Sequence, residues 1–233
     1  MNEEIETYLY ISPNKLGIYL LETKSFVNLY NEELFLKEEK EEIDLNILKD
    51  FLDKNIFKVE KLAKNFVQNI SVIIENKNLL QVQLGIKRKN YNDFIKRNYI
   101  KNSLTEARDV FVENYQNQKI IHMLINKYFI DGKSYLTLEN EIKTDHLSLE
   151  IQFNSIPNDI IYDLNKVLEN YQIKIIKYLD GKYIKNFFDK DKKIKLSEMS
   201  HKILNGCNRN EVIFVPKSAK KPAFFEKFFQ LFS

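Results

Sequence analysis

Hydrophobic and polar positions alternate near the start of the chain with the period of extended strands. Thr7–Leu21 is rich in Tyr, Leu and Ile and contains the turn sequence Ser12-Pro13-Asn14-Lys15, which predicts a β-hairpin. Phe26–Leu36 predicts a third strand, with a break at Asn31-Glu32. These residues therefore indicate a small sheet that begins with a hairpin.

From Asp44 the spacing of hydrophobic positions changes to steps of three and four, which is typical of an amphipathic helix. The positions are Leu45, Leu48, Leu52, Ile56, Val59, Leu62, Ala63 and Phe66. We expect a helix from Asp44 to about Val67, with Asp44 as N-cap. Ile70–Ile74 then predicts a buried strand, which completes half of an α/β layer.

The middle of the chain predicts a second group of elements. Leu79–Ile86 predicts a strand, and Ser103-Leu104-Thr105-Glu106 has the spacing of a capping box that would begin a helix to about Tyr115. Lys119–Ile130 predicts a long strand that ends at the turn Asp131-Gly132, and Leu147–Phe153 predicts another. Together these residues indicate a compact α+β unit.

Towards the C-terminus the pattern first continues and then weakens. Pro157 predicts the first turn of a helix to about Tyr171, and Ile173–Ile176 the next strand. Asp189–Lys195 is a charge run that we interpret as a solvated loop. Leu196–Leu204 predicts a helix, and Val212–Val215 a short strand.

The last twelve residues, from Pro222 to Ser233, have the pattern of an amphipathic helix. At helical spacing, five phenylalanines and one leucine fall within an arc of roughly 160°. We expect this helix to lie on a membrane surface, with lysines adding attraction to anionic lipid. The predicted membrane-binding residues are Phe224, Phe225, Phe228, Phe229, Leu231, Phe232, Lys217, Lys220, Lys221 and Lys227. The alternative is that the helix packs on its own domain or on a partner protein.

The charge balance argues against a dedicated nucleic-acid binder. The 233 residues carry 36 Lys and Arg against 33 Asp and Glu, a net charge of +3. One stretch combines basic and aromatic residues: Lys87-Arg88-Lys89, Tyr91, Phe94, Lys96, Arg97 and Tyr99. Contact with a nucleic-acid backbone is one interpretation of it, and a solvated loop or hairpin rim is the interpretation that we favour.

The residues needed for common catalytic and cofactor sites are scarce. Only 5 glycines are present, and no phosphate-binding loop, nucleophile elbow or zinc-protease motif occurs. His122, His146 and His201 are far apart and Cys207 is the single cysteine, so we expect no metal site and no disulfide. We interpret His122 as a satisfied structural residue. The sequence therefore predicts no enzyme and no cofactor.

Two further features bear on location. The first residues are acidic and lack the pattern of a signal peptide. No hydrophobic segment approaches the roughly 20 residues that a spanning helix needs. We therefore expect a cytoplasmic protein whose contact with the membrane is peripheral, on the inner face of the cytoplasmic membrane.

The order of these elements resembles bacterial FtsA, the actin-like protein that tethers the cell-division ring to the membrane. The segment Lys119–Gly132 resembles the family pattern I-H-x-x-P-x-x-Y-x-x-D-G, without the proline. Ser103–Ala107 resembles the helix that precedes this pattern, and Asn158–Ile176 the helix and strand that follow. The resemblance covers about residues 7–180 and the tail.

The resemblance implies an α/β (α+β) fold with a truncated actin-like first half, an inserted SHS2-like subdomain and a C-terminal amphipathic helix. Residues 1–78 and 177–190 would form the actin-like part, and residues 79–176 the inserted subdomain. Residues 191–215 would be a remnant of uncertain structure, and residues 216–233 the basic linker and membrane helix.

The chain departs from the family where nucleotide would bind. Tyr10-Ile11-Ser12-Pro13 stands at the Asp-Ile-Gly-Thr-like phosphate loop, and only Gly181 and Gly206 follow the inserted unit. ATP binding by the family mechanism is therefore not expected. The surface that contacts FtsZ in the family lies in the missing half, which places FtsZ binding in doubt.

These expectations combine into one hypothesis and one alternative. The hypothesis is an FtsA-like scaffold that associates with the membrane surface and recruits division proteins without nucleotide hydrolysis, with self-association possible through the inserted subdomain. The alternative is an actin-derived or α+β adaptor of a pilus or secretion assembly, whose C-terminal helix docks on a protein partner.

Overall fold

The computed structural model describes residues 5–36, 43–138, 142–191 and 193–212. The chain forms two compact units, each assembled from segments that are distant in sequence. Unit 1 contains the described residues within Met1–Leu79 and Ile156–Cys207, and unit 2 contains those within Leu80–Ser155 and Asn208–Ser233. The fold class predicted from the sequence, mixed α+β, is confirmed by two sheets and five helices within the described residues.

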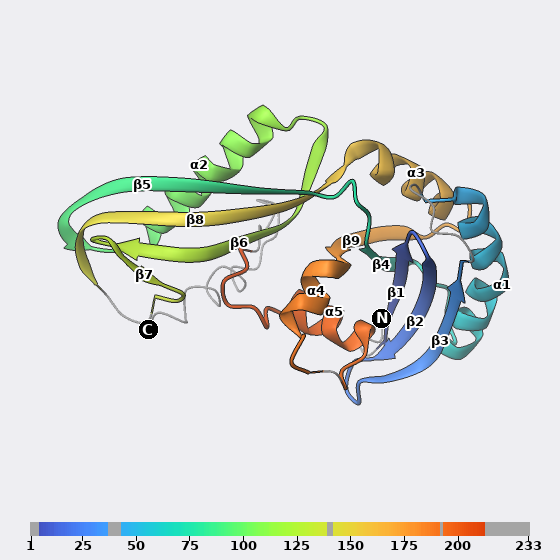
Figure 1. Cartoon of the computed structure of the whole chain (residues 1–233). Helices are drawn as coiled ribbons and strands as arrows, with labels where there is room; N and C mark the ends of the chain where they lie inside the picture. Colours follow the sequence, from blue (N-terminus) through green and yellow to red (C-terminus); the bar gives the residue numbers. More distant parts are fainter. Residues whose placement is uncertain (1–4, 37–42, 139–141, 192, 213–233) are drawn as a thin grey trace. The chain divides into compact units, whose positions relative to one another are not determined.

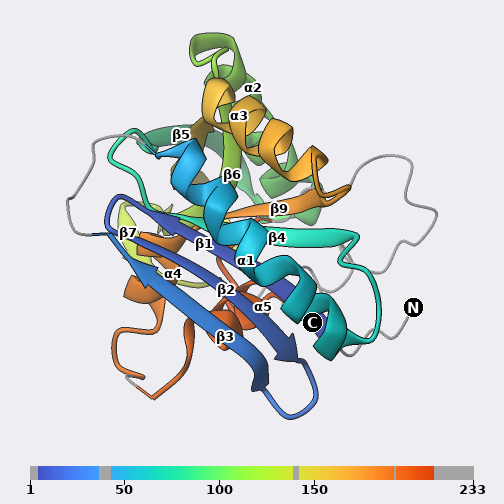
Figure 2. The ribbon, with the colours of Figure 1, turned by 90° about the vertical axis from the view of Figure 1, so that its right-hand side faces the viewer.

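A five-stranded sheet with the order β3-β2-β1-β4-β9 is the centre of unit 1 (Figures 1 and 2). Its strands are β1 (Ile5–Ser12), β2 (Lys15–Glu22), β3 (Val27–Phe35), β4 (Asn69–Ile74) and β9 (Lys174–Asp180). The first three strands are antiparallel neighbours, whereas β1 with β4 and β4 with β9 are parallel pairs. The predicted hairpin, third strand and buried fourth strand are therefore confirmed.

Helices cover both faces of this sheet (Figure 2). Helices α1 (Leu45–Ala63) and α3 (Asn158–Glu169) lie on one face, and α4 (Gly181–Phe187) and α5 (Leu196–Leu204) lie on the other. The Asp44 carboxylate accepts hydrogen bonds from the amides of Asn46 and Ile47, so the predicted N-cap of α1 is confirmed. With helices on both faces, β1 buries its residues from Tyr8 to Ser12 and β4 buries all but its first residue, as strands of parallel pairs commonly do.

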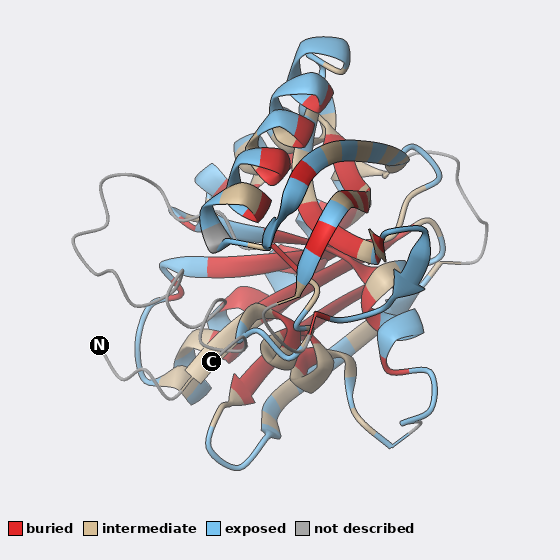
Figure 3. Ribbon diagram, turned by 90° about the vertical axis from the view of Figure 1, so that its left-hand side faces the viewer, coloured by how far each residue is buried: buried red, intermediate tan, exposed pale blue. Residues whose placement is uncertain are grey.

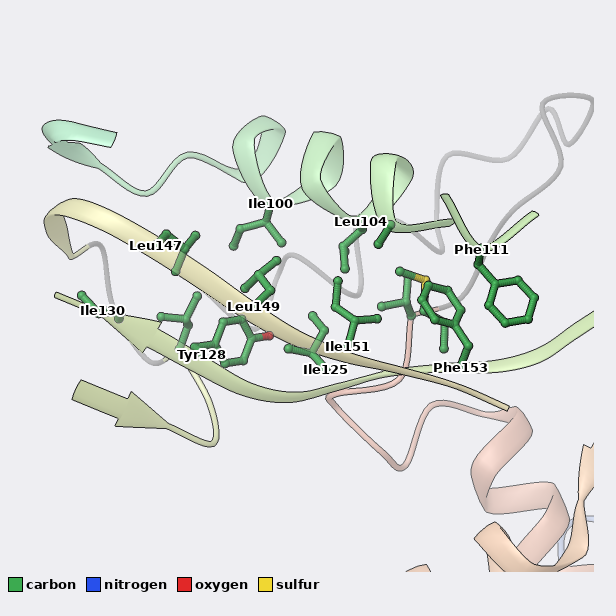
Figure 4. Close-up of a cluster of buried hydrophobic side chains, with 14 residues drawn as sticks. Ile100, Leu104, Phe111, Ile125, Tyr128, Ile130, Leu147, Leu149, Ile151 and Phe153 are labelled. Atoms are coloured by element: carbon green, nitrogen blue, oxygen red, sulfur yellow. The ribbon is translucent and has the colours of Figure 1, made fainter. Parts of the chain in front are cut away.

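Unit 2 is a four-stranded sheet with the order β5-β8-β6-β7 and one long helix (Figure 1). Along the chain its elements are β5 (Leu80–Phe94), α2 (Arg97–Asn114), β6 (Gln118–Ile130), β7 (Lys133–Tyr135) and β8 (Lys143–Pro157). The apolar residues of α2 pack on one face of the sheet (Figure 4). In that core the ring of Phe111 stacks on those of Tyr115 and Phe153, with centroid distances of 4.9 Å each.

Burial follows these two cores (Figure 3). In unit 1 the face beneath α4 and α5 buries Tyr8, Tyr10, Tyr19, Leu21, Ile73, Leu179, Ile184, Phe188 and Ile203. In unit 2 the face beneath α2 buries Ile100, Leu104, Ala107, Phe111, Met123, Ile125, Tyr128, Ile130, Leu147, Leu149, Ile151 and Phe153, with Leu138 and Val212. Removal of this apolar surface from water is the main stabilising contribution in each unit.

Two element boundaries differ from the sequence prediction. Helix α2 begins at Arg97, so the capping box at Ser103 is wrong, and the Ser103 hydroxyl instead donates to the carbonyl of Tyr99 at 3.0 Å. Burial of Ile100 in the core stabilises the additional turn. Strand β5 runs to Phe94, so the basic stretch at Lys87 lies inside a strand and does not follow one.

The units also divide the chain differently from the expected 79–176 insertion. Unit 2 begins at Leu80, close to the expected position, but its first segment ends at Ser155. The reason is that α3 packs with α1, and β9 pairs with β4. The Tyr171 hydroxyl adds hydrogen bonds to the Lys49 carbonyl at 3.2 Å and the Asp53 carboxylate at 2.7 Å. Residues 156–176 therefore belong with unit 1.

Residues 191–215, expected to be a remnant, are divided between the units as far as the structure describes them. Helix α5 is confirmed as predicted, and it packs on the unit 1 sheet. Asn208–Val212, which we call the returning segment, joins unit 2. Of the predicted strand Val212–Val215, only the first residue lies within the described part of the chain.

Candidate functional site

The predicted membrane-binding residues lie outside the described residues, which end at Val212. They are Phe224, Phe225, Phe228, Phe229, Leu231, Phe232, Lys217, Lys220, Lys221 and Lys227. Across the residues that the structure does describe, every helix is too short or too polar to cross a bilayer. Within the same residues, His, Cys, Asp and Glu side chains form no group of three or more that could hold a metal ion.

The carboxyl ends of the parallel strands β1, β4 and β9 meet at one edge of the unit 1 sheet. In open α/β sheets this edge is the usual place for a ligand site. Ser12 ends β1, Glu75 follows β4, and Asp180 ends β9. This edge is therefore the candidate site for a ligand in unit 1.

Side chains at this edge bind one another. The Lys185 ammonium of α4 lies 2.5 Å from the Glu75 carboxylate and 3.0 Å from the Tyr10 hydroxyl, and 4.8 Å from the Tyr10 ring centroid. Burial lowers the pKa of Lys185, but its hydrogen bonds to Glu75 and Tyr10 outweigh burial, so that pKa is raised overall. Lys185 therefore stays protonated and paired. We call Tyr10, Glu75 and Lys185 the edge network.

Gly181 makes room for the edge network. A Cβ at this position would lie 2.7 Å from both Cγ and Oε1 of Glu75, which is closer than real contacts allow. The neighbouring Asp180 carboxylate accepts from the amides of Lys182 at 2.9 Å and Tyr183 at 3.1 Å, so it caps α4. The carboxylates that follow β4 and end β9 are thus both engaged by groups of α4.

The hairpin beside this edge is held in the same way. The Lys15 ammonium pairs with Glu33 at 2.7 Å, and the Tyr19 hydroxyl donates to Glu33 at 2.6 Å. Burial raises the pKa of Glu33, but its hydrogen bonds from Lys15 and Tyr19 outweigh that effect, so the pKa is lowered overall. The Ser12 hydroxyl donates to the Lys15 carbonyl at 3.0 Å, within its own turn.

The segment that resembles the FtsA pattern has structural roles in unit 2. Tyr128 is buried in the core. The Asp131 carboxylate accepts from the hydroxyl of Thr144 at 2.9 Å and from the amides of Asp145 at 3.1 Å and His146 at 3.0 Å. Asp131 and Gly132 have φ angles of 46° and 85°, which confirms the predicted turn.

His122 is buried and its Nδ1 lies 2.6 Å from Glu211 Oε1. The interpretation of His122 as a satisfied structural residue is therefore confirmed. Glu211 belongs to the returning segment, which contacts β6 through an isolated antiparallel bridge between Glu211 and Leu124. The Ile125 amide donates to the Asn210 carbonyl at 2.9 Å and the Val212 amide to the Met123 carbonyl at 2.8 Å. The returning segment thus covers part of the outer edge of β6.

Several of these residues carry no sequence signal of their role. Lys185 and Glu211 are ordinary charged residues in a lysine- and glutamate-rich chain, and their partners are distant in sequence. Asp180-Gly181 before a short apolar stretch is a recognisable helix start, and it could have indicated α4. The basic stretch at Lys87 is placed on β5, and the Tyr99 hydroxyl on α2 donates to the Lys89 carbonyl at 2.9 Å.

No protein-family model and no curated protein matches this chain. Among solved structures it is similar to the PilM–PilN type IV pilus biogenesis complex, with 8% identity and a TM-score of 0.49, over 78% of this chain and 49% of that chain. It is similar to the cytoplasmic domain of EpsL, an inner-membrane component of the type II secretion system of Vibrio cholerae, with 7% identity and a TM-score of 0.38, over 77% and 58%.

A third likeness is to a Bacteroides thetaiotaomicron protein with an actin-like ATPase fold and unknown function, with 12% identity and a TM-score of 0.34, over 82% of this chain and 58% of that chain. The chain thus spans between 49% and 58% of the length of these three proteins. Because every TM-score is below 0.5, we draw no conclusion about activity or partners from these likenesses. The resemblance to FtsA stays a prediction.

Proposed function

We propose that this protein is a non-hydrolysing scaffold of the actin-derived type that acts at a membrane surface and recruits other proteins. The observation that carries the proposal is the edge network. It lies where the carboxyl ends of β1, β4 and β9 meet, and its charged groups are paired with one another. Tyr10 stands where the family resemblance places the acidic residue of a phosphate loop.

Electrostatics at this edge supports the absence of nucleotide hydrolysis. A nucleotide phosphate at this edge would be repelled by the carboxylates of Glu75 and Asp180. To pair with Lys185 it would have to break the ion pair of Lys185 with Glu75. Phosphate loops also depend on glycine amides, and the turn between β1 and β2 has Pro13 and Asn14 in its place. The edge thus favours a closed ion-pair network over an anion site.

The membrane part of the proposal is supported by the phenylalanine pattern from Pro222 to Ser233. A helix this short is marginal in water and needs an apolar surface, which a bilayer interface supplies. A division assembly is the setting that the resemblance of Lys119–Gly132 to FtsA supports. A pilus or secretion assembly, with the tail docked on a protein partner, is the alternative for the same scaffold role.

Calorimetric titration with MgATP tests the first part. We expect no binding heat for the full chain, and micromolar affinity would overturn the non-hydrolysing proposal. The variant Lys185→Met is the matched control, because it removes the ammonium and leaves Glu75 without its ion-pair partner, so any weak phosphate binding through Lys185 would disappear with it.

Co-sedimentation with anionic vesicles tests the second part. We expect the full chain to bind and a variant with Phe228→Glu and Phe229→Glu to lose most of that binding, because the charges interrupt the apolar arc. Equal binding by both proteins would refute the membrane role of the tail. Capture of a protein partner that depends on the tail and survives removal of lipid would favour the pilus or secretion alternative.

A further inference from the structure

Strand β5 contains a bulge near its end, and the bulge presents an aromatic ring to solvent. Pairing with β8 shifts between Lys89 and Asp93, so that three residues of β5 stand opposite one residue of β8. Tyr91 and Asn92 have φ angles of 51° and 53°, a region that a bulky side chain such as tyrosine rarely adopts. The Tyr91 side chain is 83% exposed, the highest value among the large hydrophobic residues described.

Neighbouring groups hold this bulge in place. The buried Asn90 amide donates to the Asp93 carbonyl, and the Tyr99 hydroxyl of α2 donates to the Lys89 carbonyl at 2.9 Å. The Asp93 carboxylate accepts from the Phe94 amide at 2.8 Å. Uncommon backbone conformations persist only where the surrounding structure maintains them, and they concentrate at functional positions. The bulge is therefore a built protrusion.

Exposed lysines and a second aromatic residue are found on the strand segments that flank the protrusion. The Lys143 ammonium lies 4.9 Å from the centroid of the Phe94 ring, which is itself 40% exposed. Among the described residues, carboxylates near these groups include that of Asp93, which pairs with Lys96 at 2.7 Å, and that of Asp145 opposite the bulge. A third is that of Glu106 on α2, which pairs with Arg88 of β5. We define the basic–aromatic tip by the following exposed residues: Lys87, Lys89, Tyr91, Phe94, Lys96 and Lys143.

We propose that the basic–aromatic tip binds anionic phospholipid headgroups. Aromatic rings prefer the headgroup level of a bilayer, and lysines beside them are attracted to the negative surface. The ring of Tyr91 protrudes with most of its surface open, which suits a deformable interface. A peptide groove would enclose the ring, and nucleic-acid strands bind grooves in which several rings stack in series. The lipid surface is thus the occupant that the geometry favours.

Lipid binding by the tip would add to lipid binding by the tail, the predicted helix from Pro222 to Ser233. In this respect the inference rests on the proposed function. One weak lipid contact gives marginal, reversible binding, and stable attachment takes two signals. The described chain ends at Val212, whose amide donates to the Met123 carbonyl of β6, in the unit that also carries the tip. We expect the tip and the predicted tail helix to supply these two signals.

Vesicle co-sedimentation of the full chain tests the tip directly. Vesicles of phosphatidylglycerol and phosphatidylethanolamine are compared with vesicles of phosphatidylcholine. Combined Lys89→Gln and Lys143→Gln should weaken binding to the anionic vesicles roughly tenfold or more at low salt, because each lysine contributes a factor of about five. Tyr91→Ser should also weaken it, and binding to phosphatidylcholine should stay low throughout.

Matched variants on unit 1 are the controls. Tyr162→Ser removes an exposed tyrosine of α3, and combined Lys54→Gln and Lys58→Gln removes two exposed lysines of α1. Both should bind like the wild type, and unchanged thermal unfolding shows that the tip variants are folded. Replacement of Tyr91 by serine also changes the backbone preference at this positive-φ position. Tyr91→Phe keeps an aromatic ring there, and it should retain binding.

The failures of the two proposals are distinguishable. Wild-type binding by Tyr91→Ser and by the double lysine variant overturns the tip, even if Phe228→Glu with Phe229→Glu shows that the tail binds lipid. Loss of binding in the tip variants with no effect of the tail variant overturns the tail and supports the tip. If the tip variants lose a protein or nucleic-acid partner and keep vesicle binding, the lipid proposal is also overturned.

Discussion

Asp131 begins the turn between β6 and β7, and its carboxylate organises the start of β8. It accepts hydrogen bonds from two backbone amides and one hydroxyl of residues 144–146. These hydrogen bonds, chiefly that from the His146 amide, lower the pKa of Asp131 below the ordinary value of 3.8. The residue has a positive φ, which asparagine tolerates as well as aspartate does, so Asp131→Asn isolates the charge.

We expect Asp131→Asn to lower the free energy of unfolding at neutral pH. Since the folded-state pKa lies below the unfolded value, the carboxylate stabilises unit 2 above about pH 4, and this contribution is lost as the pH falls through the folded-state pKa. Urea unfolding at pH 7, 5 and 3 should show a difference from wild type that shrinks at acidic pH. Asp145→Asn is the control, and a difference as large at pH 3 as at pH 7 would contradict the assignment.

The residues of the edge network show which parts of the site the sequence could indicate. The loss of the phosphate-loop pattern at Tyr10-Ile11-Ser12-Pro13 is visible in the sequence and predicts that the ordinary nucleotide contacts are missing. The edge network that stands at this place cannot be read from the sequence, because the residues of unit 2 lie between Glu75 and Lys185 along the chain. No spacing rule links residues on either side of such an insertion.

At the scale of elements, strong hydrophobic periodicity is sufficient to predict a helix or strand, whereas short elements give too few positions to predict. The hairpin at β1 and β2, helix α1 and strand β6 each have long amphipathic patterns, and each is confirmed. Helix α4 has two turns and β7 has three exposed residues, which is too little pattern to detect. The start of α2 was misplaced because packing of Ile100 on the sheet prevailed over the local capping signal.

The returning segment contacts β6 through one buried side-chain pair, Glu211 with His122, and through two backbone hydrogen bonds. Glu211→Ala leaves the buried His122 ring without this partner, which costs about 1–3 kcal/mol, and weakens the pairing of Asn210 and Val212 with β6. We expect faster hydrogen exchange at the Ile125 amide, which donates to Asn210. Glu198→Ala, at a partly exposed ion pair on α5, is the control and should not change that amide. Unchanged exchange at Ile125 in Glu211→Ala would contradict this role.

At the scale of the whole molecule, the two units have separate cores. The cluster beneath α2 and the cluster beneath α4 and α5 share no residue. Each unit is built from two stretches of chain, so neither is a simple continuous domain. The resemblance to FtsA predicted an inserted subdomain that starts at residue 79, close to the start of unit 2 at Leu80. The end of unit 2 instead depends on tertiary contacts of α3 and β9 within unit 1.

Because the cores are separate, we expect a destabilising substitution in one core to affect mainly the unit that contains it. Phe153→Ala removes a fully buried ring that stacks on Phe111, and we expect a loss of about 3–5 kcal/mol in unit 2. Hydrogen exchange should accelerate at amides of β6 and β8 and change little at amides of β1 and β4, because these hydrogen bonds are protected by a different core. Ile73→Ala, in the unit 1 core, is the reciprocal variant and should reverse the pattern. Equal acceleration in both units by either variant would mean that the chain unfolds as one cooperative body, and the tip of unit 2 could then no longer be treated as a surface that functions independently of unit 1.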